Sequence, residues 1–172
     1  MSNTKRSDDT SIHCIPFRGF LKGDARFLLF SVFMHENLLM SDIKSDPYAN
    51  LSWIMPRTHE YFNLKGRFYI ASAPIQITRF PPPKITKENA SGYWEQERLR
   101  QWSLLDHQLR ATFTWPSRTE VIDNKSLLCQ SLPYDKSCLL IDIAMDNFCL
   151  LVYKVTEAEY LDYSIFPPKR MV

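Results

Sequence analysis

Glycine is scarce in this chain: only 4 of its 172 residues are glycine, and no two of them form a G-x-G pattern. A dinucleotide-binding fingerprint and a P-loop both need closely spaced glycines, so both are excluded. The four cysteines include no C-x-x-C pair, and neither His35-Glu36 nor His59-Glu60 begins an H-E-x-x-H motif. The sequence therefore predicts no metal site, and it predicts reduced thiols in a cytoplasmic protein.

An excess of charge of one sign is also missing. Lys and Arg number 21 and Asp and Glu number 19, which gives a formal net charge of +2 with both signs interspersed. We therefore expect no nucleic-acid partner. The longest apolar stretch, from Phe27 to Met34, is strand-sized and is interrupted by Ser31, so no membrane span or membrane partner is expected.

Aromatic residues are abundant, at 13% of the chain, which favours a β-rich fold or a large interface. The length supports one domain with a proper core. Residues 1–10 are charged and polar and are expected to be a disordered tail, which leaves residues 11–172 as a single domain.

Hydrophobic periodicity predicts a mixture of strands and helices. A short helix is expected at 37–44, with Leu39, Met40 and Ile43 on one side, and a long helix at 90–113. A loop is expected at 120–135 and a turn or short helix at 157–162. The expected strands are 12–20, 26–34, 49–55, 61–70, 75–80, 139–145 and 147–155. On the long helix, the apolar side should consist of Trp94, Leu99, Trp102, Leu105, Leu109 and Phe113, with Glu95, Gln96, Arg98, Arg100 and Gln101 outside. The order of elements predicts an α+β fold with an antiparallel barrel.

The segment from Trp53 to Arg67 reads W-x-x-P-x-T-x-E-x-F-x-x-x-G-R. This pattern resembles a signature of the pyridoxamine 5'-phosphate oxidase-like split barrels, which bind flavin mononucleotide (FMN), in the branch shared by fungi and cyanobacteria. Residues 15–20, 98–116 and 146–162 are similar to further family segments in the same order. The resemblance implies an antiparallel FMN-binding split β-barrel with flanking helices, and a homodimer with FMN in a cleft at its interface.

The residues that grip the FMN phosphate in that family are replaced in this chain. The first arginine of the family strand R-T-V-V-F-R-G falls on His13, and the arginine, serine and lysine of D-I-R-S-x-K fall on Glu36, Asn37 and Leu39. The glutamine and arginine of R-E-Q-F-R fall on Tyr61 and Asn63. Charge-assisted hydrogen bonds contribute roughly 1.5–3 kcal/mol each, so losing two or three would weaken FMN binding by about three orders of magnitude or more.

Two hypotheses about function follow. In one, the chain is an FMN-dependent oxidoreductase whose flavin is held by a rebuilt set of residues: Arg18, Lys44, Arg57, Tyr61 and Arg67. In the other, it is a cofactor-free pseudoenzyme that serves as a structural or protein-interaction module with a protein partner. Loss of the phosphate-gripping residues favours the second hypothesis. No catalytic residue is identified, because no nucleophile lies in a recognisable motif.

Overall fold

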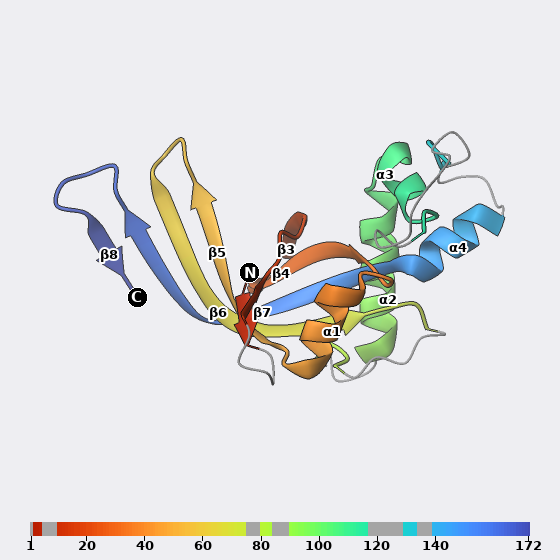
Figure 1. Ribbon diagram of the computed structural model, residues 1–172, viewed down its shortest axis with the longest axis horizontal. Helices are drawn as coiled ribbons and strands as arrows, with labels where there is room; N and C mark the ends of the chain where they lie inside the picture. Colours follow the sequence, from red (N-terminus) through yellow and green to blue (C-terminus); the bar gives the residue numbers. More distant parts are fainter. Residues whose placement is uncertain (1, 5–9, 75–79, 84–89, 117–128, 134–138) are drawn as a thin grey trace.

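One antiparallel sheet organises the molecule (Figure 1). The computed structural model describes residues 2–4, 10–74, 80–83, 90–116, 129–133 and 139–172. Their eight strands follow the order β2-β1-β5-β6-β7-β4-β3, with β8 paired to β7. Within these residues no ladder joins β2 to β3, so the sheet is coiled but open. The fold is α+β, as the sequence predicts.

The strands are β1 (Ser2–Thr4), β2 (Thr10–Ile12), β3 (Phe17–Leu21), β4 (Asp24–Phe33), β5 (Tyr48–Met55), β6 (Glu60–Ala71), β7 (Phe148–Asp162) and β8 (Lys169–Met171). The helices are α1 (Asn37–Ser45), α2 (Ala90–Ser103), α3 (His107–Thr112) and α4 (Leu139–Asn147).

The two faces of the sheet are set by alternation along β6. Its even-numbered residues from Leu64 to Ile70 are buried, whereas its odd-numbered residues from Tyr61 to Tyr69 are exposed or half-buried. The even residues belong to the inner face, which α1 covers with Leu39, Met40 and Ile43, as predicted. On the outer face, α2 places Trp94 against residues of β4 and β7. Residues 27–32 of β4 are buried on both faces because helices cover both of its sides, in agreement with the apolar stretch that only Ser31 interrupts.

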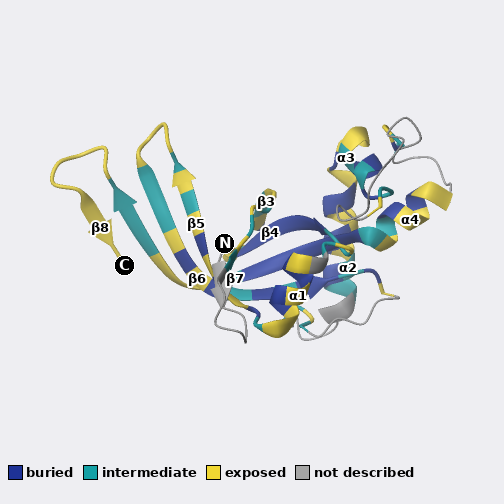
Figure 2. Ribbon diagram, viewed as in Figure 1, coloured by how far each residue is buried: buried dark blue, intermediate teal, exposed yellow. Residues whose placement is uncertain are grey.

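Part of the sheet projects beyond the helices. This wing consists of β8 and the adjoining ends of β5–β7, residues 52–63 and 157–162 (Figure 1). Figure 2 shows that the wing is mostly exposed or half-buried, whereas the centre of the sheet is buried. The wing therefore presents both of its faces to the surroundings.

The predicted strand at 139–145 is wrong, because these residues form helix α4. Its run Leu139–Ile143 is apolar except for Asp142, and a short, mostly apolar run of this kind fits a helix or a buried strand equally well. Packing decides between them: Ile141 and Ala144, three positions apart, are the buried residues of the helix.

The long helix expected at 90–113 is interrupted after Ser103. Asp106 caps α3, since its carboxylate accepts a hydrogen bond from the Leu109 backbone N–H at 2.6 Å. Three assignments on this segment are also wrong: Leu99 is 38% exposed, whereas Arg98 and Gln101, expected outside, are each 3% exposed. Arg98 lies inside because its guanidinium donates to Glu95 and to the backbone carbonyl of Met145.

Smaller differences occur along the rest of the chain. β7 continues through 157–162, where a turn or short helix was expected, because it pairs there with β6 and β8. The strand expected at 12–20 is divided, with residues 13–16 outside β2 and β3. Residues 2–4, expected to belong to a disordered tail, form β1 and pair with β2. Most of the loop at 120–135 and of the strand at 75–80 lies outside the described residues.

Candidate functional site in the loop groove

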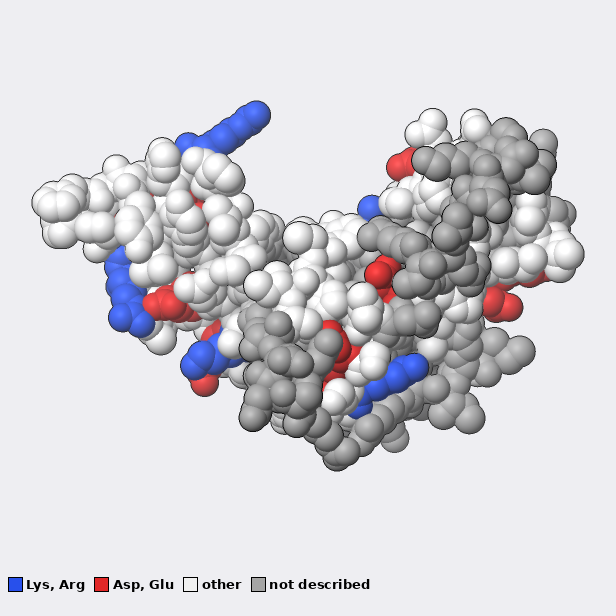
Figure 3. All heavy atoms as spheres, viewed as in Figure 1, with Lys and Arg blue, Asp and Glu red and all other residues white. Residues whose placement is uncertain are grey.

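Three neighbouring cavities follow the segment of residues 13–16 between β2 and β3; together we call them the loop groove. Their volumes are about 270, 250 and 230 Å³. The first and second share His13, Cys14 and Ile15, and the second and third share Pro16, Phe33 and Glu36. The groove thus runs from Trp53, on the wing, to Trp115, after α3. Figure 3 shows this face of the molecule hollowed between the wing and the helices, the region where β3 lies in Figure 1.

A polar contact holds His13, a lining residue of the loop groove, against α1. His13 Nε2 lies 2.8 Å from Asp42 Oδ2, and the Ser11 hydroxyl donates to the same oxygen. The side chain of Asp42 is only 5% exposed and that of His13 is 16% exposed. A buried carboxylate needs compensating partners, and Asp42 on α1 finds them in Ser11 and His13. These contacts hold the β2 end of the groove against α1.

The structure brings together three of the positions that the resemblance predicts to be replaced phosphate ligands. His13, Glu36 and Leu39 all line the second cavity of the groove, although 26 positions separate the first from the last. Asn37 lies at the start of α1, beside them in the chain. The remaining two positions are elsewhere: Tyr61 packs edge-on against Tyr163, and Asn63 accepts a hydrogen bond from Ser52.

The groove residues do not fit the phosphate of FMN. A phosphate dianion needs cationic or several N–H and O–H donors around it. Among the described residues, no Lys or Arg lines any of the three cavities, and Glu36 brings an anionic group to two of them. His13 is already engaged by Asp42. The groove instead combines one carboxylate with aromatic and apolar walls.

The five residues predicted to rebuild an FMN site are dispersed. Arg18 lies on β3, Lys44 in the last turn of α1, and Arg57 in the exposed turn between β5 and β6. Tyr61 and Arg67 share the outer face of β6 but are six residues apart, or about 20 Å along a strand. None of the five lines the loop groove.

Sequence reasoning missed Asp42. A signal was present, because this residue falls between Leu39 and Ile43 on the apolar side of α1. A charged residue on the buried side of a helix requires a partner, and that requirement pointed to a polar contact within the core.

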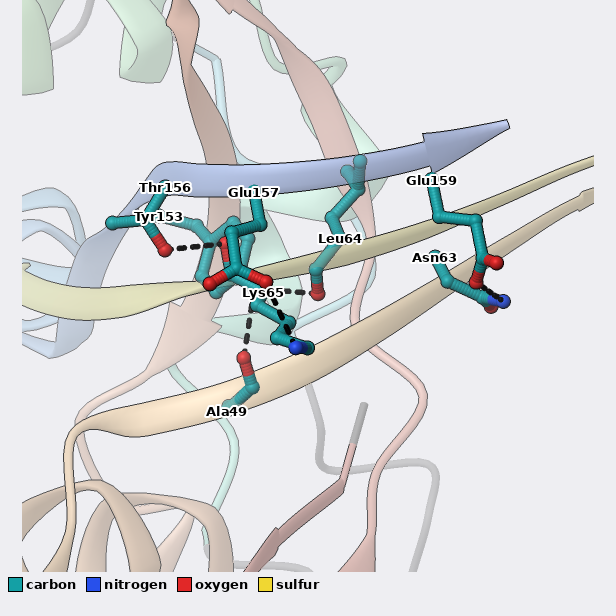
Figure 4. Close-up of polar contacts among 8 residues, drawn as sticks. All are labelled: Ala49, Asn63, Leu64, Lys65, Tyr153, Thr156, Glu157 and Glu159. Carbon is teal, nitrogen blue, oxygen red and sulfur yellow. Dashed lines mark hydrogen bonds and ion pairs between the residues drawn. The ribbon is translucent and has the colours of Figure 1, made fainter. Parts of the chain in front are cut away.

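A cavity of about 450 Å³ lies on the outer face of the wing, over β5–β8. Its charged side chains are paired with one another. Lys65 Nζ lies 2.8 Å from Glu157, and Glu159 accepts a hydrogen bond from Asn63 (Figure 4). Arg170 also contacts Glu159. These pairs leave the lining without an uncompensated charge.

The described residues contain no group of three or more His, Cys, Asp or Glu side chains that could hold a metal ion. In the same part of the chain, no helix combines the length and the apolar character needed to cross a membrane.

Two solved structures share this architecture. A pyridoxamine 5'-phosphate oxidase-related, FMN-binding protein from Nostoc punctiforme superimposes with a TM-score of 0.73 at 20% identity, over 98% of this chain and 76% of that one. PhzG from Burkholderia lata, in complex with tetrahydrophenazine-1-carboxylic acid, gives a TM-score of 0.62 at 11% identity, over 98% and 71% of the two chains. No protein-family profile and no curated protein sequence matches the chain.

The chain therefore has the fold of the pyridoxamine 5'-phosphate oxidase-like FMN-binding split barrels. This confirms the fold that the hairpin pattern at Trp53–Arg67 predicts.

Proposed function

We propose that this split-barrel protein does not hold FMN in the loop groove and serves as a protein-interaction module. The observation that carries the proposal is the composition of the groove, where His13, Glu36 and Leu39 meet and no Lys or Arg of the described residues joins them. Fold does not determine function, and a cavity with a carboxylate in place of cations repels a phosphate dianion.

The visible absorbance spectrum tests this proposal. Protein purified without added cofactor, and protein incubated with excess FMN and desalted, should both lack a flavin band. A band retained at stoichiometric occupancy in either sample would contradict the proposal.

A pair of variants tests whether the residues of the loop groove account for the expected loss of FMN phosphate binding. The double variant His13→Arg/Glu36→Arg restores two of the cations of the family pattern and should retain more FMN than the wild type. The matched control Glu36→Gln removes the anion without adding a cation, and it should retain little. Equal retention of FMN by both variants would show that the cations at positions 13 and 36 do not contribute to phosphate binding.

The alternative function is an FMN-dependent oxidoreductase of the same fold. It is supported by the Nostoc punctiforme protein, which is described as FMN-binding. In this case Arg67→Ala should lower flavin occupancy, whereas Lys65→Ala, which removes a cation paired with Glu157, should not. Unchanged occupancy in Arg67→Ala would remove that residue from the site.

For the partner of the module we propose a second copy of the chain. Phe17, Phe20 and Trp53 form the β3 aromatic cluster, with ring centroids 4.7 Å apart between Phe17 and Trp53. Phe17 is 38% exposed and Phe20 is 49% exposed, so the cluster retains apolar surface that an interface would cover. A cytoplasmic location and the absence of nucleic-acid and membrane partners remain predictions of the sequence.

A further inference from the structure

Two cations lie directly opposite each other on the outer face of the sheet. Arg67 on β6 is the register partner of Lys154 on β7. Tyr48 on β5 and Phe27 on β4 complete the same row across four strands. Like charges at directly opposed positions of a ladder repel, so this arrangement is unfavourable unless an anion lies between them.

Arg67 is surrounded by rings. Its guanidinium carbon lies 5.2 Å from the ring centroid of Tyr69, 5.4 Å from that of Phe80 and 5.5 Å from that of Tyr48. Its Nε is buried and has no hydrogen-bond partner in the described part of the chain. Aromatic rings hold a guanidinium in place but accept no hydrogen bonds in its plane, so they leave its N–H donors for an in-plane acceptor.

Other cations on the same face have carboxylate partners. Lys65, two residues before Arg67, pairs with Glu157, and Arg170 pairs with Glu159. Figure 4 shows the first of these pairs, between β6 and β7. For Arg67 and Lys154, the described residues supply no carboxylate within ion-pair distance.

Asp24 is a carboxylate that interacts electrostatically with Lys154 at longer range, but it already forms an ion pair with Arg26. Arg26 donates to Asp24 through Nε at 2.9 Å and through Nη2 at 2.7 Å. The hydrogen bond from Arg26 lowers the pKa of Asp24 to about 2, and the charge of Lys154 contributes less. Asp24 thus stays ionised but bound to Arg26, and the group of Arg26, Asp24, Arg67 and Lys154 keeps a positive balance.

We propose that Arg67 and Lys154 form a binding site for an oxyanion, supplied as a phosphate ester or a carboxylate. The Arg67 fork would donate from Nε and one Nη to two oxygens, and Lys154 would supply the second charge. The exposed ring of Tyr48 would flank the bound group. This site is on the outer face, away from the loop groove, and it does not depend on the function proposed above.

A nuclear magnetic resonance titration tests the site directly. The Arg67 Nε–H resonance is followed while chloride is replaced at constant ionic strength by inorganic phosphate in one series and by benzoate in another. We expect a saturable shift with at least one of them. Saturation with phosphate alone assigns a phosphate ester, and saturation with benzoate alone assigns a carboxylate. A shift that grows linearly without saturation in both series overturns the proposal.

Three variants separate a built site from general charge attraction. Arg67→Lys keeps the charge but removes the fork, and it should weaken binding about tenfold when the amide resonances of β6 are followed instead. Lys154→Met should also weaken binding. The matched control Lys65→Met loses the same charge on the same face and should bind like the wild type. Equal affinity in Lys154→Met and Lys65→Met would also overturn the proposal.

Discussion

Gly66 shows how a single residue fixes the centre of the sheet. A Cβ atom at this position would lie 2.3 Å from the Lys154 backbone oxygen and 2.7 Å from Cζ of Tyr153. The Tyr153 ring occupies the space that a side chain would need, and its hydroxyl lies 2.8 Å from the Ala49 carbonyl oxygen and 2.9 Å from that of Leu64 (Figure 4). The glycine is therefore required for close approach between β6 and β7.

Substituting Gly66 by alanine should destabilise the fold. The added methyl group meets backbone on one side and a buried ring on the other, and overpacking of this kind costs about 3 kcal/mol. The free energy of unfolding in urea measures the effect. Asn50→Ala, an exposed change on the neighbouring strand, is the control and should cost less than about 0.5 kcal/mol. A loss as small as that of the control would show that β6 and β7 can separate locally.

The cysteines should differ in reactivity according to their burial. Burial raises the pKa of Cys149 to about 12, whereas Cys14 is exposed. Because the thiolate is the reactive form, iodoacetamide at pH 8 should label Cys14 in the folded protein and Cys149 only after unfolding. Peptide mass spectrometry measures the two labelled fractions. Rapid labelling of Cys149 in the folded state would contradict its placement in the core.

The same shift gives a pH dependence of stability. The pKa of Cys149 rises from its usual 9.0 to about 12 on folding, so the unfolded chain loses this proton first as the pH increases. The stabilising contribution is complete below pH 9 and is lost as the pH rises from 9 through about 12. Cys149→Ser or Cys149→Ala should flatten the fall in unfolding free energy over this range. An identical slope in the wild type and in both variants would contradict the assignment.

At the scale of elements, the junction between α2 and α3 depends on Arg110. Its guanidinium donates to the carbonyl oxygens of Trp102, Ser103 and Leu105, at 3.3, 3.1 and 2.6 Å. These carbonyls lie where α2 ends and lack partners within the helix. A buried side chain from α3 thus satisfies the end of α2, which the periodicity of 90–113 could not predict because apolar spacing carries no information about caps.

Arg110→Met should therefore unfold this corner. Several buried carbonyls would lose a charged donor, and we expect a loss of about 3 kcal/mol in unfolding free energy. The control is Arg100→Met on α2, whose side chain is 45% exposed and pairs with Glu97, and it should cost under about 1 kcal/mol. Urea unfolding followed by circular dichroism compares the two. Equal losses would show that the contacts of Arg110 with the carbonyls are dispensable.

For the whole molecule, the sequence predicted the fold better than it predicted which distant residues come together in space. The pattern at Trp53–Arg67 led to the right fold through its resemblance to a family, whereas the strands on either side of its turn could be predicted from local alternation. The assembly of His13, Glu36 and Leu39 was foreseeable only through the resemblance to a family. The pairing of Arg67 with Lys154 was not foreseeable, since register between β6 and β7 is set by packing over the whole sheet.

The proposed homodimer gives a prediction about the whole molecule. If the β3 aromatic cluster lies in the interface, Phe20→Glu introduces a charge that cannot be buried there without a partner, and the dimer should dissociate. Sedimentation velocity at micromolar concentration measures the mass. Leu104→Glu is the matched control, because Leu104 is 60% exposed between α2 and α3, and it should leave the mass unchanged. A wild-type protein that sediments as a monomer would exclude the homodimer, and the exposed aromatic rings would then require a different partner.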